Sequence, residues 1–81
     1  MGARVELPAE LSDLLRSELA KAIYESALSR EDTLIATRYF IEKVPQVDIA
    51  AELGYERSMI TRRLPEITKR VSFVAQRLNF T

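Results

Sequence analysis

The chain has 81 residues, of which 47% are apolar and 30% are charged, and its formal net charge is zero. A chain of this length holds a single core, and its apolar content suits a packed domain rather than a disordered segment. Cysteine and histidine are both absent, which excludes disulfides, the usual zinc sites and catalysis by a thiol or an imidazole.

The first expected helix spans residues 8–28. Pro8 suits the first helical turn, where its missing N–H removes no hydrogen bond. The apolar residues that follow recur at helical spacing and predict one continuous buried stripe. The stripe consists of Leu11, Leu14, Leu15, Leu19, Ala22, Ile23 and Ala27.

A second helix is expected over residues 30–43. Ser29 precedes it as a cap, and Asp32 takes the place of the glutamate of a capping box. Val44 ends it, because a residue before a proline disfavours the helical conformation. The residues expected to be buried are Leu34, Ile35, Ile41 and either Tyr39 or Phe40.

Residues 46–64 show the pattern of two short helices joined by a glycine. Ile49, Ala50 and Leu53 recur at helical spacing over 46–53, and Gly54 ends that helix. Ala50 is small enough for two helices to cross closely, and Gly54 tolerates the positive φ of a sharp corner. This pattern is typical of the helix-turn-helix, whose second helix lies in the DNA major groove. Any two amphipathic helices joined by a glycine share part of it.

A proline divides the last part of the chain. Pro65 lacks an N–H and costs about 3 kcal/mol inside a helix, so we expect a kink or a break there, with a helix over 56–64 and another over 65–78. The last helix carries a narrow apolar seam, formed by Ile67, Val71, Val74 and Leu78. A seam of this width suits pairing with a second subunit, and packing within the domain is the alternative. The expected fold is one all-α domain over 1–81, a bundle of four to five helices containing the helix-turn-helix.

Charge is distributed unevenly along the chain. Residues 1–55 contain six basic and ten acidic side chains, whereas residues 56–81 contain six basic and two acidic ones. The two parts therefore carry charges of −4 and +4. A phosphate backbone responds to a local basic surface rather than to the net charge, so the balanced total does not exclude nucleic acid as a partner.

Residues 28–71, which are 44 of the 81 residues, resemble region 4 of bacterial sigma factors and the related LuxR-type helix-turn-helix domains. The segments that carry the likeness are LSREDTLIATRYF, DIAAELGY and RSMITRRLPEI. Two departures are Glu56, where the family usually has a serine or threonine cap, and Pro65, where its helix commonly continues. The chain also lacks the regions with which a sigma factor melts promoters and clamps polymerase. The resemblance implies a free-standing transcription regulator of bacterial or phage type.

The second helix of this motif supplies the expected DNA contacts. With Ile60 and Leu64 facing inward, its opposite face presents the expected base-contacting residues, Arg57, Ser58, Thr61 and Arg62. Arginine can donate two hydrogen bonds to the O6 and N7 atoms of guanine, and serine or threonine can bond to several bases. The residues expected to contact the DNA backbone are Gln46, Arg63, Lys69 and Arg70.

We expect double-stranded DNA as the partner, bound by a homodimer. LuxR-type domains dimerise through an analogous last helix, which assigns the dimer interface to the apolar seam. The competing class is a protein-interaction module that binds RNA polymerase or a sigma or anti-sigma partner. Titration of random duplex at two salt concentrations distinguishes these classes: DNA binding weakens steeply with salt, whereas a protein-interaction module shows no appreciable affinity for duplex at either concentration.

No enzymatic activity, metal or cofactor is expected. Glu31 and Asp32 are adjacent carboxylates in the first turn of a helix, where the helix dipole favours acids without any catalytic role. Only two glycines are present, so no phosphate-binding loop is indicated. No apolar run approaches the ~20 residues that span a bilayer, and the N-terminus lacks a signal-peptide pattern, so we expect a cytoplasmic protein.

Overall fold

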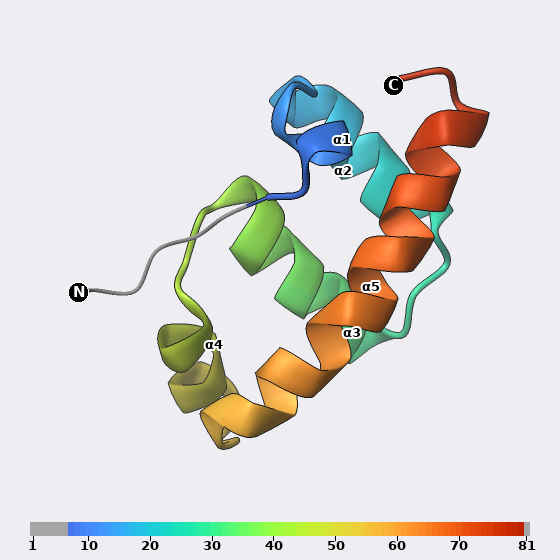
Figure 1. Ribbon diagram of the computed structural model, residues 1–81. Coiled ribbons are helices and arrows are strands. Elements are labelled where there is room, and N and C mark those ends of the chain that lie inside the picture. The colour runs from blue at the N-terminus through green and yellow to red at the C-terminus, as the bar shows by residue number, and fades with distance from the viewer. Residues whose placement is uncertain (1–6, 81) are drawn as a thin grey trace.

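The computed structural model describes residues 7–80, which form helices and turns but no strand (Figure 1). The predicted all-α class is therefore confirmed. In chain order the elements are α1 (Ala9–Ser12), α2 (Arg16–Glu25), α3 (Arg30–Ala36), the π-helical turn η1 (Thr37–Ile41), α4 (Gln46–Leu53) and α5 (Arg57–Arg77).

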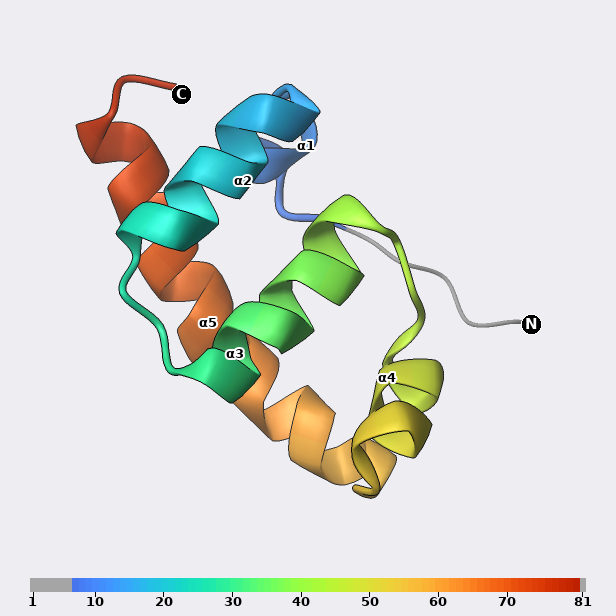
Figure 2. The ribbon, with the colours of Figure 1, turned by 180° about the vertical axis from the view of Figure 1, so that it is seen from behind.

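Helix α5 is the element on which the other four α-helices pack. Its first part contacts α4, and its later turns run beside α2, with α3 between these two regions (Figures 1 and 2). The core draws on every one of these elements. Its largest fully buried side chains are Leu11, Ile35, Phe40, Ile49, Ile60, Ile67 and Val71. No helix among the described residues is both long and apolar enough to cross a membrane.

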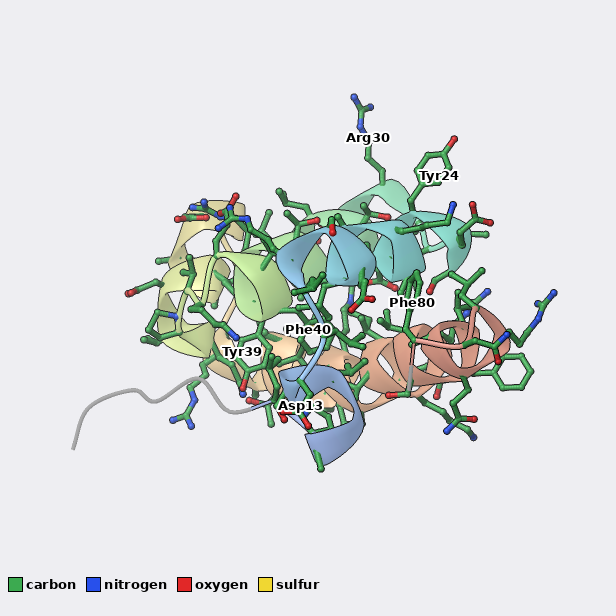
Figure 3. The ribbon with its side chains drawn as sticks, turned by 90° about the horizontal axis from the view of Figure 1, so that it is seen from above. Asp13, Tyr24, Arg30, Tyr39, Phe40 and Phe80 are labelled. Carbon is green, nitrogen blue, oxygen red and sulfur yellow. The ribbon has the colours of Figure 1, made fainter. Side chains whose placement is uncertain are left out.

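The single helix predicted over 8–28 is wrong, because the chain forms two helices there. Leu15 adopts an extended backbone, and its N–H donates to Oε1 of Glu18 (2.8 Å), which starts α2 at the next residue. Figure 3 shows α1 and α2 as separate helices, with Asp13 between them. The break buries Leu11 and leaves Leu15 66% exposed. Ala27 lies beyond the end of α2 and is exposed, so the predicted stripe is not continuous.

The helix predicted over 30–43 begins as expected and ends earlier. The Ser29 hydroxyl accepts a hydrogen bond from the Asp32 N–H (3.1 Å), which confirms the predicted cap. After α3 the helix widens into η1, which ends at Ile41. A π-helical turn contains an additional residue and so shifts the register of the side chains. Tyr39 and Phe40 are consequently both buried, with their rings in an edge-to-face contact at 5.7 Å (Figure 3).

The prediction that Leu34 is buried is also wrong. This side chain lies on the outer side of α3 and is 44% exposed, whereas the adjacent Ile35 is fully buried. The reason is that no helix among the described residues covers the outer side of α3 at Leu34. A run of consecutive apolar residues does not show which of them faces the core.

Helix α4 has the predicted bounds, but the two helices predicted after it form a single helix. Pro65 lies inside α5 on its exposed side, and the α5 ribbon bends in its first half (Figures 1 and 2). Leu64 and Ile67, on either side of the proline, are both buried. Their packing holds the helix together across Pro65, since tertiary contacts supply most of the stability of a helix and outweigh a local cost of about 3 kcal/mol.

Residues with positive φ follow or close four of the helical elements. These residues are Ala27, Lys43, Gly54 and Asn79. The backbone then turns back on the helix: the Tyr55 N–H donates to the carbonyl of Ala50 (2.8 Å), and the Phe80 N–H donates to the carbonyl of Ala75 (2.9 Å). Such bonds satisfy carbonyls that a helix end otherwise leaves unpaired. The predicted positive φ of Gly54 is confirmed at 75°.

We expect Gly54→Val to lower the free energy of unfolding by about 1–2 kcal/mol, because L-residues are strained in the left-handed conformation. No heavy atom lies within 4 Å of a Cβ placed at Gly54, so the cost arises from the backbone rather than from a clash. Urea denaturation measures it, and Gly54→Asn serves as the control because asparagine tolerates this conformation better. Equal midpoints for the parental protein and the valine variant would contradict this account.

Candidate nucleic-acid interface

Helices α4 and α5 are joined by residues 54–56 and pack against each other. Ala50 and Ile60 are buried, one from each helix, so the small alanine lies within the core. Glu56 precedes α5 with an extended backbone and offers no side-chain cap. The first turns of α5 consequently lie at the same end of the molecule as α4 (Figure 1).

The four predicted base-contacting residues lie together on the first two turns of α5. They line one shallow hollow and are all exposed, and we call them the Arg57 surface: Arg57, Ser58, Thr61 and Arg62. The buried Ile60 and Leu64 occupy the opposite side of the same turns. Within the part of the chain that the structure describes, Arg62 makes only a long contact to the sulfur of Met59 (3.9 Å), so its guanidinium is available to a ligand.

A hydrogen bond connects this surface to the start of α4. The Thr61 hydroxyl donates to Oε1 of Gln46 at 2.7 Å. The amide nitrogen of Gln46 makes no hydrogen bond within the described residues and retains two donors. The structure therefore brings Gln46 next to the predicted base-contacting residues, at the N-terminal end of a helix, where an anion is favoured. Sequence spacing alone could not show this pairing, because fifteen positions separate the two residues.

Arg63, which was predicted to contact the DNA backbone, is engaged within the chain instead. Its guanidinium donates to Oε1 of Glu31 (2.5 Å) and reaches Oδ1 of Asp32 (3.3 Å). It also lies over the ring of Tyr55, 5.7 Å from the ring centre. This pairing competes with the predicted contact to the DNA backbone, which stays a prediction. The acidic pair that begins α3 binds this arginine, and together they link α3 to α5.

The same cluster alters the acidity of its members. The pKa of Glu31 lies below its ordinary value of 4.5, first because the Tyr55 hydroxyl donates to the carboxylate (2.5 Å) and second because Arg63 does. The pKa of Tyr55 is raised, since ionisation would remove the donor to Glu31. The pKa of Arg63 is raised mainly by its hydrogen bond to Glu31. The charged form of Glu31 is thus the form that the fold favours.

We expect Glu31→Gln to reduce the melting temperature most above pH 4.5 and progressively less at lower pH. A carboxyl whose pKa is lowered by folding contributes stability above its unfolded pKa, and this contribution is lost as pH falls through the folded pKa. Thermal melts of both proteins from pH 7 to about pH 3 measure the difference. Tyr55→Phe removes the principal hydrogen-bond donor to the Glu31 carboxylate. This variant should therefore show a weaker pH dependence of the melting temperature than the parental protein over the same range. A constant difference across the range would contradict the role of this carboxylate.

Lys69 and Arg70, also predicted to contact the backbone, lie on a different part of α5. Both are exposed and border a hollow between the end of α2 and the later turns of α5. This hollow shares no lining residue with the Arg57 surface. Because α5 does not break at Pro65, its second half continues along α2, and the structure does not bring these two residues next to Gln46.

The apolar seam forms part of the domain's own core. Ile67 and Val71 are buried against the rest of the same chain, and Val74 packs on that core as a partly buried side chain. Leu78, the fourth member, is also partly buried. The predicted dimer interface is corrected accordingly, because Ile67 and Val71 cannot contact a second subunit while they fill this core. The narrow seam reflects the packing of α2 against α5.

The sequence analysis did not identify a group of ion pairs, centred on Arg38, that connects η1 to α4. Arg38 of η1 donates through Nε to Glu52 of α4 (2.9 Å), pairs with the second oxygen of that carboxylate, and contacts Glu42 at 2.5 Å. This bidentate ion pair links η1 to α4. The spacing of Arg38 and Glu42 by four residues was a possible signal, whereas the link to Glu52 depends on the tertiary fold.

Neither a metal site nor a known relative identifies the chemistry of this surface. The described residues contain no cluster of three or more acidic, histidine or cysteine side chains that could hold a metal ion. No model of a known protein family, no curated protein and no solved structure matches this chain. The resemblance to region 4 of sigma factors therefore stays a prediction from the residues quoted above.

Proposed function

We propose that this protein is a transcription regulator that binds double-stranded DNA, with α4 and α5 acting as a helix-turn-helix. The observation that carries the proposal is the Arg57 surface. Two arginines and two hydroxyl residues occupy the exposed side of the first turns of α5, while the apolar residues of those turns are buried. A helix that presents such donors at its start is suited to base edges in a major groove.

Each member of the surface has a role in this proposal. Arg57 and Arg62 would each bind a guanine through two hydrogen bonds, and Ser58 and Thr61 would bond to neighbouring bases. Gln46 would donate its amide to a phosphate at the start of α4. The acidic charge of residues 1–55 would repel the phosphates and so orient the molecule with α5 toward the duplex.

The resemblance to sigma region 4 and LuxR-type domains favours a cytoplasmic regulator of bacterial or phage type. A homodimer through the apolar seam is not part of the proposal, because two seam residues are buried within the protomer. The operator is a short sequence contacted through the Arg57 surface of a single protomer.

Titration of labelled random duplex at two salt concentrations tests the proposal. On random duplex, where Arg57 and Arg62 would neutralise about two phosphates instead of binding guanines, affinity should fall about 12-fold between about 50 and about 200 mM monovalent salt. Selection from a random DNA pool then yields the preferred sequence. Absence of duplex binding at both salt concentrations would refute the proposal.

A protein-interaction module is the second candidate, with RNA polymerase or a sigma or anti-sigma protein as the partner. The observation that favours it is the exposed apolar surface of Tyr24 in α2 and of Leu15, the residue before α2. Tyr24 is 81% exposed, and Figure 3 shows it projecting from the molecule near Arg30. A single exposed aromatic residue is common on monomeric proteins, which makes this the weaker candidate. Binding to polymerase without binding to duplex would favour it.

A further inference from the structure

A second concave surface lies at the other end of α5 from the Arg57 surface. Its volume is about 350 Å³, and it is formed by Ser26 at the end of α2 together with the later turns of α5. Phe73 and Val74 supply its apolar lining. We call it the Phe73 hollow.

Phe73 is the unusual member of this lining. This residue is 60% exposed, although Val71 and Ala75, two positions before and after it in the sequence, are fully buried. Val74, the next residue, is partly buried and continues the apolar surface toward the core. A phenylalanine in this position leaves most of its apolar surface in contact with water and contributes little to the core. A partner that covers the ring would bury this surface, which is energetically favourable.

Basic residues surround the ring within one helical turn on each side. Lys69 and Arg70 precede Phe73 by four and three residues, and Arg77 follows it by four, so all three are its neighbours on the helix. Unlike Arg38 and Arg63, these three cations form no ion pair with any side chain that the structure describes. Glu66 is the single acid in the lining, which leaves the hollow with a net positive charge.

We propose that the Phe73 hollow binds an acidic peptide segment of a partner protein, one that carries a large apolar side chain between its carboxylates. The apolar side chain packs on Phe73 and Val74, and the flanking carboxylates pair with Lys69, Arg70 and Arg77. An interface of this kind has an aromatic anchor surrounded by charge-complementary contacts.

DNA phosphates fit this hollow less well than such a peptide. Phosphates would engage the cations but would leave the Phe73 ring in water. The hollow is also separated from the Arg57 surface, because Phe73 follows Arg57 by sixteen residues, or about 24 Å along the helix. Occupation of one surface therefore leaves the other free, and the inference does not depend on DNA binding.

Fluorescence anisotropy with a fluorescein-labelled peptide of glutamates around one central phenylalanine tests the proposal. Arg70→Glu and Phe73→Ser should each weaken binding about tenfold or more, since loss of a central contact typically has this effect. Arg62→Glu is the matched control, because it changes the net charge equally but lies on the Arg57 surface. It should weaken binding less than about twofold by the same measure. Circular dichroism verifies that the variants, altered at exposed positions, retain the helical fold.

Five outcomes would overturn the proposal. The first is no binding of the peptide by the parental protein, and the second is equal weakening by Arg62→Glu and Arg70→Glu, which would indicate non-specific attraction of charges. The third is equal affinity for a peptide whose central phenylalanine is replaced by serine. The fourth is a loss of duplex affinity in Phe73→Ser as large as that in Arg62→Ala, which would assign the hollow to DNA. Salt-sensitive self-association abolished by Arg70→Glu would likewise overturn it, by identifying a second copy as the occupant.

Discussion

Phe40→Ala is expected to lower the free energy of unfolding by about 3–5 kcal/mol, the range typical of a fully buried phenylalanine. The Phe40 side chain has no exposed surface and lies in η1, between α3 and the loop that leads to α4. Its loss leaves a cavity and removes the edge-to-face contact with Tyr39. A domain of this size has a total stability of about 5–10 kcal/mol, so the variant should be largely unfolded in mild urea.

Urea denaturation followed by circular dichroism measures this effect. Leu34→Ala is the matched control, because Leu34 lies in α3, directly before η1, but is 44% exposed and should cost less than about 1.5 kcal/mol. Phe40→Leu should fall between the two, since leucine fills most of the cavity. If the alanine variants of Phe40 and Leu34 unfold at the same urea concentration, the inward orientation of Phe40 in the π-helical turn is wrong.

Arg57→Ala and Arg62→Ala are each expected to weaken binding to the selected DNA sequence by about 1–3 kcal/mol. Under the proposed function both guanidinium groups contact bases, so each substitution should also relax the preference at one position of the site. Random duplex should be bound with a smaller loss, because base contacts contribute little to it.

Arg77→Ala is the matched control for these two variants. It removes the same charge from the last turn of α5, far from the Arg57 surface, and should leave the sequence preference unchanged. Binding curves on the selected duplex and on single-base variants of it distinguish the two effects. If neither Arg57 nor Arg62 affects affinity or preference, α5 does not enter the groove by its first turns.

Features with a strong local signal were predictable from the sequence. The apolar spacing between Pro45 and Gly54 predicted the bounds of α4, and Ser29 predicted the start of α3. The positive φ of Gly54 followed from the need for a sharp corner. The exposed position of Arg57 and Arg62 followed from the helical period, because Ile60 and Leu64 occupy the opposite side. Each of these depends on residues at most four positions apart.

Only the tertiary structure decided three features. These are where α1 ends, how η1 shifts the register of the side chains that follow α3, and whether α5 continues through Pro65. Local preferences in these segments amount to about 1–3 kcal/mol, and the burial of Leu11, Phe40 and Ile67 outweighs them. The partner of Arg63 was likewise beyond prediction, because Glu31 is thirty-two positions away in the chain. The helical period indicates which side of a helix is polar. The packing of the other helices determines whether a cation on that side meets a carboxylate of its own chain or faces solvent, where a ligand can reach it.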